Sequence, residues 1–143
     1  MIPKYLVDID LQAMPIVDTD VIVIGAGIAG LFTALRASET SKVVMVTKKS
    51  LLDSNTRYAQ GGIAAVISDD DSPQYHLQDT LIAGAGLCDV EAVDVLVHEG
   101  PMGVEHLIQL GTQFDTENGE YALTKEGAHS QRRILHANGD ATG

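Results

Sequence analysis

The chain has a single cysteine and few basic side chains. One thiol, Cys88, cannot form a disulfide or a zinc cluster within the chain, which is typical of a protein in the reducing cytosol. Nine Lys and Arg residues stand against 20 Asp and Glu residues, for a formal net charge of −11. A surface that binds many phosphates must be basic, so this charge argues against a protein that binds nucleic acid or an anionic membrane.

Long apolar runs are also missing. The first 15 residues contain charged side chains and no continuous apolar region, so no secretory signal peptide is predicted. The most apolar stretch, residues 21–35, contains three glycines and is shorter than a membrane span. Hydrophobic residues nevertheless make up 45% of the chain, which is typical of a globular domain. We therefore expect a soluble, cytoplasmic protein.

The strongest local pattern lies between residues 20 and 46. Val21–Ile24 is typical of a strand buried on both faces of a parallel sheet, and Leu31, Ala34 and Leu35 follow at helical spacing. A second strand-like run, Val43–Val46, completes a βαβ unit of roughly 30 residues. The pattern predicts an α/β fold with a Rossmann-like parallel sheet.

Shorter elements are expected in the rest of the chain. Residues 47–57 read as a polar loop and residues 63–67 as a strand. The three aspartates of Ser68–Pro73 indicate a solvated loop rather than a metal site, and we expect no bound metal. A helix over residues 79–85 should end at Gly84 or Gly86.

The second half of the chain is predicted to be helical and then to form a hairpin. Asp89 has the place of an N-cap for a helix that Gly100-Pro101 should break. A separate helix over residues 102–110 should end at Gly111. Asn118-Gly119 is typical of a hairpin turn between short strands.

The sequence Gly25-Ala26-Gly27-Ile28-Ala29-Gly30 follows the first predicted strand and opens the first predicted helix. Gly25 permits a tight turn, Gly27 lets a pyrophosphate approach the backbone, and Gly30 lets the helix lie close to the strand. The helix N-terminus adds N–H groups and a partial positive charge. This turn predicts a dinucleotide ligand.

The glycine turn does not decide which dinucleotide is bound. NAD-binding proteins usually have an acidic residue at the end of the second strand, whereas here Val46 is followed by Thr47-Lys48. Lys48 fits a reader of a 2′-phosphate. It fits equally a position along the adenosine end of FAD, with Thr47 as the ribose partner.

A second motif favours a flavin. Backbone amides around Gly61-Gly62 can approach a flat heterocycle closely, and the side chains of Thr56 and Gln60 can hydrogen-bond at its edge. This arrangement suits an isoalloxazine ring. The predicted flavin loop comprises Asn55, Thr56, Arg57, Tyr58, Ala59, Gln60, Gly61 and Gly62.

With this loop, the chain resembles the succinate dehydrogenase and fumarate reductase flavoprotein family. The likeness covers residues 20–143, which would form the N-terminal part of an FAD-binding domain, with residues 1–19 as an extension. Three further stretches, 76–88, 111–115 and 123–137, make the chain most similar to those members that oxidise L-aspartate. The resemblance implies FAD as cofactor, with Gly25–Gly30, Lys48 and the flavin loop holding it.

The resemblance also implies how the cofactor is held and what is oxidised. In the membrane-bound members a histidine at the position of Asn55 carries the flavin covalently, and an amide cannot form that bond, so FAD should be noncovalent. The implied reaction oxidises L-aspartate to iminoaspartate, with oxygen or fumarate as acceptor. It is the first step of de novo NAD biosynthesis, and quinolinate synthase would use the product.

The family's substrate-orienting glutamate falls on Glu126, which would hold the amino group of L-aspartate. The alternative is a surface carboxylate beside Lys125. Further donors lie close by in the sequence, and the residues alone do not decide which of them contact a ligand. They are His129, Arg132, Arg133 and His136.

The family's remaining parts would lie beyond residue 143: a capping domain, an acid-base arginine, the second half of the FAD-binding domain and a C-terminal helical domain. We therefore expect an incomplete FAD-binding domain that exposes an apolar sheet face and is inactive alone. Two alternatives are a fragment of a fumarate reductase or succinate dehydrogenase type flavoprotein and a noncatalytic nucleotide-binding remnant.

Overall fold

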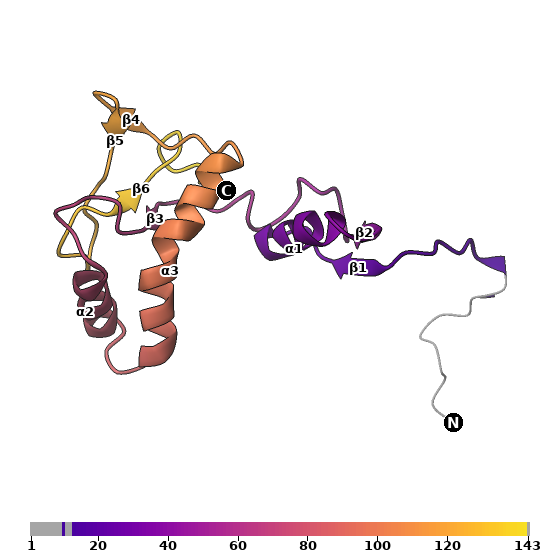
Figure 1. Cartoon of the computed structure of the whole chain (residues 1–143), viewed down its shortest axis with the longest axis horizontal. Helices are drawn as coiled ribbons and strands as arrows, with labels where there is room; N and C mark the ends of the chain where they lie inside the picture. Colours follow the sequence, from indigo (N-terminus) through magenta and orange to yellow (C-terminus); the bar gives the residue numbers. More distant parts are fainter. Residues whose placement is uncertain (1–9, 11–12, 143) are drawn as a thin grey trace. The chain divides into compact units, whose positions relative to one another are not determined.

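The computed structural model describes residue 10 and residues 13–142, in two compact units that comprise residues 1–54 and 55–143 (Figure 1). Most of the predicted extension over residues 1–19 lies outside the described residues. Among the described residues, no helix has both the length and the apolar character needed to cross a bilayer.

The first unit is a βαβ arrangement. Strand β1 (Val21–Ile24) is followed by helix α1 (Ile28–Ser38) and strand β2 (Val43–Val46). The two strands pair in parallel, with Val21 opposite Val43 and Ile24 opposite Val46. The predicted order strand, helix and parallel strand is confirmed.

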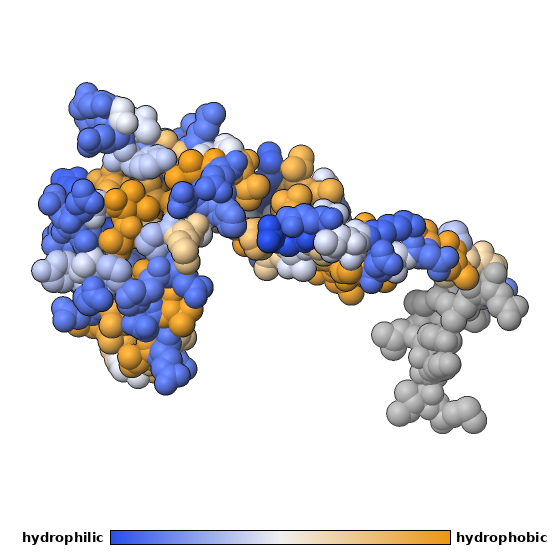
Figure 2. Space-filling model, viewed as in Figure 1, coloured by the Kyte–Doolittle hydropathy of each residue, from blue (hydrophilic) through white to orange (hydrophobic). Residues whose placement is uncertain are grey.

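Only one face of this small sheet is covered. Val23 is buried and lies on the side of α1, whereas 62% of Ile22 and 84% of Ile24 are exposed. Successive side chains of a strand point to opposite faces, so one helix can bury only one of the two sets. The prediction of a strand buried on both faces is therefore wrong in this structure, and the expected exposed apolar face is present. Figure 2 shows hydrophobic side chains at the surface of this unit.

The second unit begins with a loop and contains two helices that pack against each other, together with short strands. Strand β3 (Ile63–Ala64) pairs antiparallel with β6 (Ile134–Leu135) and is shorter than the predicted strand over 63–67. The hairpin of β4 (Thr116–Glu117) and β5 (Glu120–Tyr121) is confirmed. Its turn residues Asn118 and Gly119 both have positive φ, as a two-residue hairpin turn requires. The buried core consists of Ala65, Val104, Phe114, Leu135 and Ala137.

Helix α2 (Pro73–Ala83) begins six residues before the predicted start, Asp79. Ser72 caps it by accepting a hydrogen bond from the backbone N–H of Tyr75, and Pro73 occupies the first turn, where no N–H is needed. The Ser-Pro pair was interpreted as part of a loop, although it is also a typical helix start. Gly84 ends the helix, as predicted.

Helix α3 (Val90–Gln109) is continuous, so the predicted break at Gly100-Pro101 is wrong. A proline disfavours helix in the residue before it partly through a clash with that residue's Cβ, and Gly100 has none. The buried side chains Val93, Val97 and Val104 lie on both sides of the proline, so packing holds the helix together. Asp89 caps the start and Gly111, with φ +104°, follows the end, as predicted.

Candidate functional site

The glycine turn joins β1 to α1 in the first unit. Gly25 has φ +105°, and its N–H donates to the carbonyl of Val46 at 2.8 Å, which ties the turn to the end of β2. Helix α1 starts after Gly27, with neither a side-chain cap nor an acidic residue in its first turn. The partial positive charge of this helix end is therefore not offset by a local carboxylate, which suits an anionic ligand.

Gly30 packs the helix against the turn. A Cβ built on Gly30 would overlap the carbonyl oxygen of Gly25 and lie 3.6 Å from Cγ1 of Val23. The close approach predicted for Gly30 is confirmed, because a side chain there would collide with the turn backbone. The residues present therefore fit a bound pyrophosphate, while their part in binding stays a prediction.

Lys48 lies two residues after β2 and is exposed. The carboxyl ends of parallel strands meet at the same edge of a sheet, so Lys48 is on the edge that carries the glycine turn. Its cation therefore adds to the positive charge at this edge of the first unit.

The predicted flavin loop, residues 55–62, belongs to the second unit, and Gly61, just before its last residue, is left-handed with φ +99°. A Cβ on Gly62 would overlap Cγ2 of Ile134 and lie 3.0 Å from the Leu135 carbonyl oxygen and 3.1 Å from Cε1 of His136. The loop backbone thus lies directly on strand β6. Beside it is an open pocket of about 390 Å³, whose lining residues are Arg57, Tyr58, Ala59, Gln60, Asn138, Asp140 and Ala141.

Glu126 contacts one of the four candidate donors. Nε2 of His136 lies 2.9 Å from Oε1 of Glu126 and 3.0 Å from Oγ1 of Thr124, while Nδ1 lies 2.9 Å from the Gly139 carbonyl oxygen. Backbone pairing of Thr124 with Ile134 brings the two segments together. The Glu126 side chain is half exposed, so a ligand could reach it.

Arg133 is committed to the fold. Its side chain is fully buried, and it donates to Asp71 through Nε and Nη2 and to Asp79 through Nη1. Asp79 also accepts hydrogen bonds from the backbone N–H and hydroxyl of Ser130. The guanidinium is thus occupied by two carboxylates and is not available to those of a substrate.

Asp71 corrects the interpretation of residues 68–73 as a solvated loop. Its side chain is only 1% exposed, because it lies against Arg133. Burial alone would raise the pKa of Asp71, but the hydrogen bonds and charge of Arg133 outweigh it and the pKa is lowered. Burial would also raise the pKa of Asp79, but the hydrogen bond from the Ser130 backbone, followed by those from Arg133 and the Ser130 hydroxyl, outweighs it and the pKa is lowered. The two carboxylates in turn raise the pKa of Arg133.

Two histidines border this ionic cluster. The rings of His76 and His129 lie 5.6 Å apart, and Nδ1 of His129 is 3.2 Å from Nη1 of Arg133. His76 is buried, and its Nδ1 has no hydrogen-bond partner among the described residues. Burial lowers the pKa of His76, and the charges of Arg133 and His129 lower it further.

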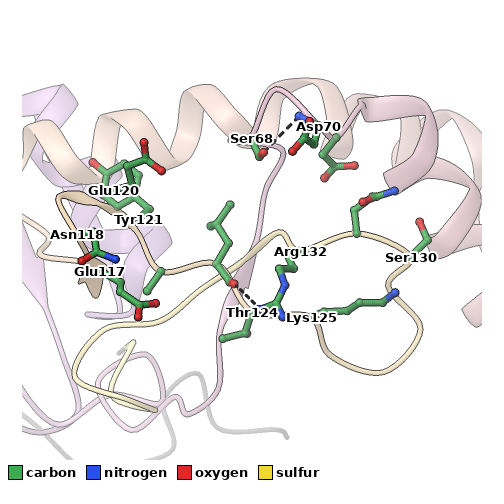
Figure 3. Close-up of a pocket in the computed structure, with 14 residues that line it drawn as sticks. Ser68, Asp70, Glu117, Asn118, Glu120, Tyr121, Thr124, Lys125, Ser130 and Arg132 are labelled. Atoms are coloured by element: carbon green, nitrogen blue, oxygen red, sulfur yellow. Dashed lines mark hydrogen bonds between the residues drawn. The ribbon is translucent and has the colours of Figure 1, made fainter.

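A larger pocket of about 690 Å³ lies between the acidic loop, the hairpin and residues 122–132 (Figure 3). Four of its lining residues are acidic, namely Asp70, Asp71, Glu117 and Glu120, and two are basic, namely Lys125 and Arg132. Neither Glu126 nor the flavin loop lines it. An excess of carboxylates repels a dicarboxylate, so this pocket does not suit such a substrate.

Sequence reasoning missed the pairing of Arg133 with Asp71 and Asp79. The partners are 62 and 54 residues apart along the chain, and neither aspartate belongs to a pattern shared with the arginine. The available signal was the helix start at Ser72-Pro73. A helix that begins there has Asp71 just before its first turn and Asp79 in its middle.

A family model of the FAD binding domain matches residues 20–143, and the chain therefore belongs to the FAD binding domain family. FAD is accordingly the cofactor of this class of protein, and oxidoreductase flavoproteins are its relatives.

The particular protein to which the chain is similar is L-aspartate oxidase. The enzyme of Streptomyces coelicolor is 55% identical over 126 residues, which are 87% of this chain and 22% of the relative. That of a Nostoc species is 51% identical over 87% of this chain and 21% of the relative. The chain thus spans about a fifth of the length of the curated relatives it matches.

Solved structures extend the likeness to the wider family. Mycobacterium smegmatis Sdh1 in complex with UQ1 superposes with a TM-score of 0.76 at 35% identity, covering 86% of this chain and 21% of that one. A quinol fumarate reductase of E. coli superposes with a TM-score of 0.78 at 31% identity, covering 87% of this chain and 22% of that one. The α/β class and the predicted relation to fumarate reductase flavoproteins are confirmed.

Proposed function

We propose that this chain supplies the FAD-binding part of a cytoplasmic oxidoreductase that converts L-aspartate to iminoaspartate, with oxygen or fumarate as electron acceptor. The observation that carries the proposal is the glycine turn at the uncapped, electropositive start of α1. The turn occurs in a chain that is 51–55% identical to L-aspartate oxidases of bacteria. In this role the product would pass to quinolinate synthase, in NAD biosynthesis.

The cofactor would be held by two sets of residues. Gly25–Gly30 would receive the pyrophosphate in a Rossmann-like βαβ unit, with Lys48 along the adenosine end. The loop Asn55–Gly62 would lie against the flavin ring, where Gly61 and Gly62 keep the backbone free of side chains. Asn55 has no nucleophilic ring nitrogen, so FAD would be held noncovalently.

FAD, when bound, would supply the two-electron acceptor for the hydrogen on C2 of the substrate. Glu126 would accept a charge-assisted hydrogen bond from the substrate ammonium and so orient C2. Arg133 is occupied by Asp71 and Asp79, and Arg132 lines the acidic pocket, which leaves His129 as the candidate donor to a substrate carboxylate.

The 143 residues alone are not expected to turn over L-aspartate. Ile22 and Ile24 expose one whole face of the β1–β2 sheet, as expected when further strands or helices must cover it. Formation of hydrogen peroxide by the purified chain on addition of L-aspartate would contradict this expectation.

A fumarate reductase type flavoprotein fragment is the second candidate. The fold similarity to quinol fumarate reductase, with a TM-score of 0.78, favours it. The 31% identity to that structure is well below the 55% identity to L-aspartate oxidase, and the first proposal is therefore preferred.

A titration of the purified chain with FAD tests the proposal. Gly27 has φ −75° and ψ 175°, a conformation that valine also adopts, so Gly27→Val should block the pyrophosphate without straining the backbone. FAD affinity should fall at least about tenfold. The matched control is Gly103→Ala, because Gly103 lies inside α3 with open space around its Cβ position.

Equal FAD affinity in the two variants would contradict the proposed pyrophosphate site. Failure of the unmodified chain to bind FAD would contradict the proposal as a whole. Binding without the loss in Gly27→Val would favour a different nucleotide-binding surface.

A further inference from the structure

His136 links the predicted flavin loop to the predicted substrate glutamate, and both lie in the second unit. Its Cε1 is 3.1 Å from the position that a Cβ of Gly62 would occupy, so the ring lies directly against the loop backbone. Its Nε2 is 2.9 Å from Oε1 of Glu126. Only 14% of the His136 side chain is exposed, which limits the positions open to the ring.

The partners of the ring assign its protons. Nδ1 lies 2.9 Å from the carbonyl oxygen of Gly139, which can only accept, so Nδ1 carries a hydrogen. A neutral ring with that hydrogen has a lone pair on Nε2, and this lone pair would face the Glu126 carboxylate at 2.9 Å. The contact with Glu126 is a hydrogen bond only when Nε2 also carries a hydrogen, which it then donates to the carboxylate. The carboxylate of Asp140, 3.7 Å from Nδ1, adds a second negative charge beside the ring.

We infer that His136 is a positioning residue, whose Nε2–H group holds the Glu126 carboxylate beside the flavin loop until an ammonium-bearing ligand binds Glu126 instead. The inference rests on the proposed function, because only a ligand with an ammonium group competes for Glu126 in this way. Thr124 supports the arrangement, since its hydroxyl oxygen lies 3.0 Å from the same Nε2.

The ring is held by backbone structure on several sides. The backbone carbonyl of His136 accepts a hydrogen bond from the N–H of Asp115 at 2.7 Å. The preceding residues, Ile134–Leu135, form β6, and β6 pairs with β3, which directly follows the flavin loop. Movement of the loop is therefore coupled to the ring, and through the ring to Glu126. A glutamine or asparagine can replace one of the two ring nitrogens but not both.

Two variants separate the roles of the ring nitrogens. In His136→Gln the side-chain NH₂ group lies near the place of Nε2 and keeps the donor to Glu126. In His136→Asn it lies near the place of Nδ1 and keeps only the donor to Gly139. In the ¹³C-labelled 143-residue chain, the carboxyl signal of Glu126 should move toward that of a free side chain in His136→Asn and stay near its native position in His136→Gln. His98→Gln is the control, because His98 is on α3 and pairs with Asp94.

A purely structural role for the ring would destabilise both variants without separating the Glu126 signals, and that result would overturn the inference. Should the variants fail to fold, the ring ¹⁵N signals of His136 in the unmodified chain test whether Nε2 donates to Glu126. Nε2 should carry a hydrogen, and Glu126→Gln, a change at a half-exposed side chain, should shift the Nε2 signal. An Nε2 without a hydrogen, unaffected by Glu126→Gln, would overturn the inference.

A parallel FAD titration of the unmodified chain keeps the two proposals apart. If the Glu126 signal behaves as expected but the chain does not bind FAD, the proposed function is overturned and the Glu126–His136 pair stands. FAD binding with an unchanged Glu126 signal in His136→Asn would overturn the inference and leave the proposed function standing.

Discussion

The guanidinium of Arg133 holds the carboxylate of Asp71 by two parallel hydrogen bonds, 2.7 Å from Nε to Oδ2 and 2.8 Å from Nη2 to Oδ1. The exposed fractions of the two side chains are 0% and 1%. Asp79 accepts a third hydrogen bond from the same group, at 2.6 Å. Because buried charges are costly without partners, the acidic loop, α2 and the segment before β6 depend on one another through this cluster.

Replacing Arg133 by methionine should destabilise the chain strongly. The change leaves two carboxylates without their cation, and breaking a buried pair in this way costs about 3–5 kcal/mol. The free energy of unfolding, measured by urea denaturation, should fall by that amount. Arg132→Met is the control, since Arg132 is exposed. The free energy of unfolding of this variant should lie within about 0.5 kcal/mol of that of the unmodified chain. Similar values for the two variants would show that the cluster contributes little.

Acid should unfold the chain by protonating Asp71 and Asp79. The pKa of each is lowered from 3.8 in the folded state, so the stabilisation is complete above pH 3.8 and is lost as the pH falls through the lower folded pKa values. The melting temperature should therefore drop on the acidic side of pH 4. Asp71→Asn should be less stable at neutral pH and lose less on acidification; a parallel pH profile would contradict this assignment.

His76 should add a second pH dependence, at milder acidity. Its pKa is lowered from 6.5, so the neutral ring stabilises the fold above pH 6.5 and this contribution is lost as the pH falls toward the folded pKa. Stability should therefore decline as the pH is lowered from about 6.5. His76→Phe replaces the ring by one that does not titrate, and the difference between the two pH profiles isolates His76. Identical slopes below pH 6.5 would exclude this role.

Gly62→Ala should displace the flavin loop. The new methyl group would overlap Cγ2 of Ile134, and no rotation of its own can relieve the overlap, so overpacking should cost about 1–3 kcal/mol. The thermal midpoint should fall accordingly. Gly127→Ala is the matched control, because a Cβ there meets open space. Equal midpoints for the two variants would mean that the loop does not lie on β6 as described.

Much of the first unit could be predicted from the sequence. Val21–Ile24, the glycine turn and Val43–Val46 follow one another within a short stretch, and each pattern depends on neighbouring residues. The prediction of full burial for β1 was wrong, because burial depends on what covers Ile22 and Ile24 and not on their own character. In the same way, α3 passes Pro101 because Val93, Val97 and Val104 pack on one face.

The sequence by itself determined the local structure of this protein: the order of β1, α1 and β2, the helix ends at Asp89 and Gly111, and the hairpin turn at Asn118-Gly119. Each depends on backbone conformation and hydrogen bonds within a few residues. Only the tertiary structure decided that Arg133 is structural, that Asp71 is buried, and that His136 lies between Gly62 and Glu126. Burial, the pairing of charges and steric contact are set by groups that the chain brings together from many residues away, and no local pattern contains them.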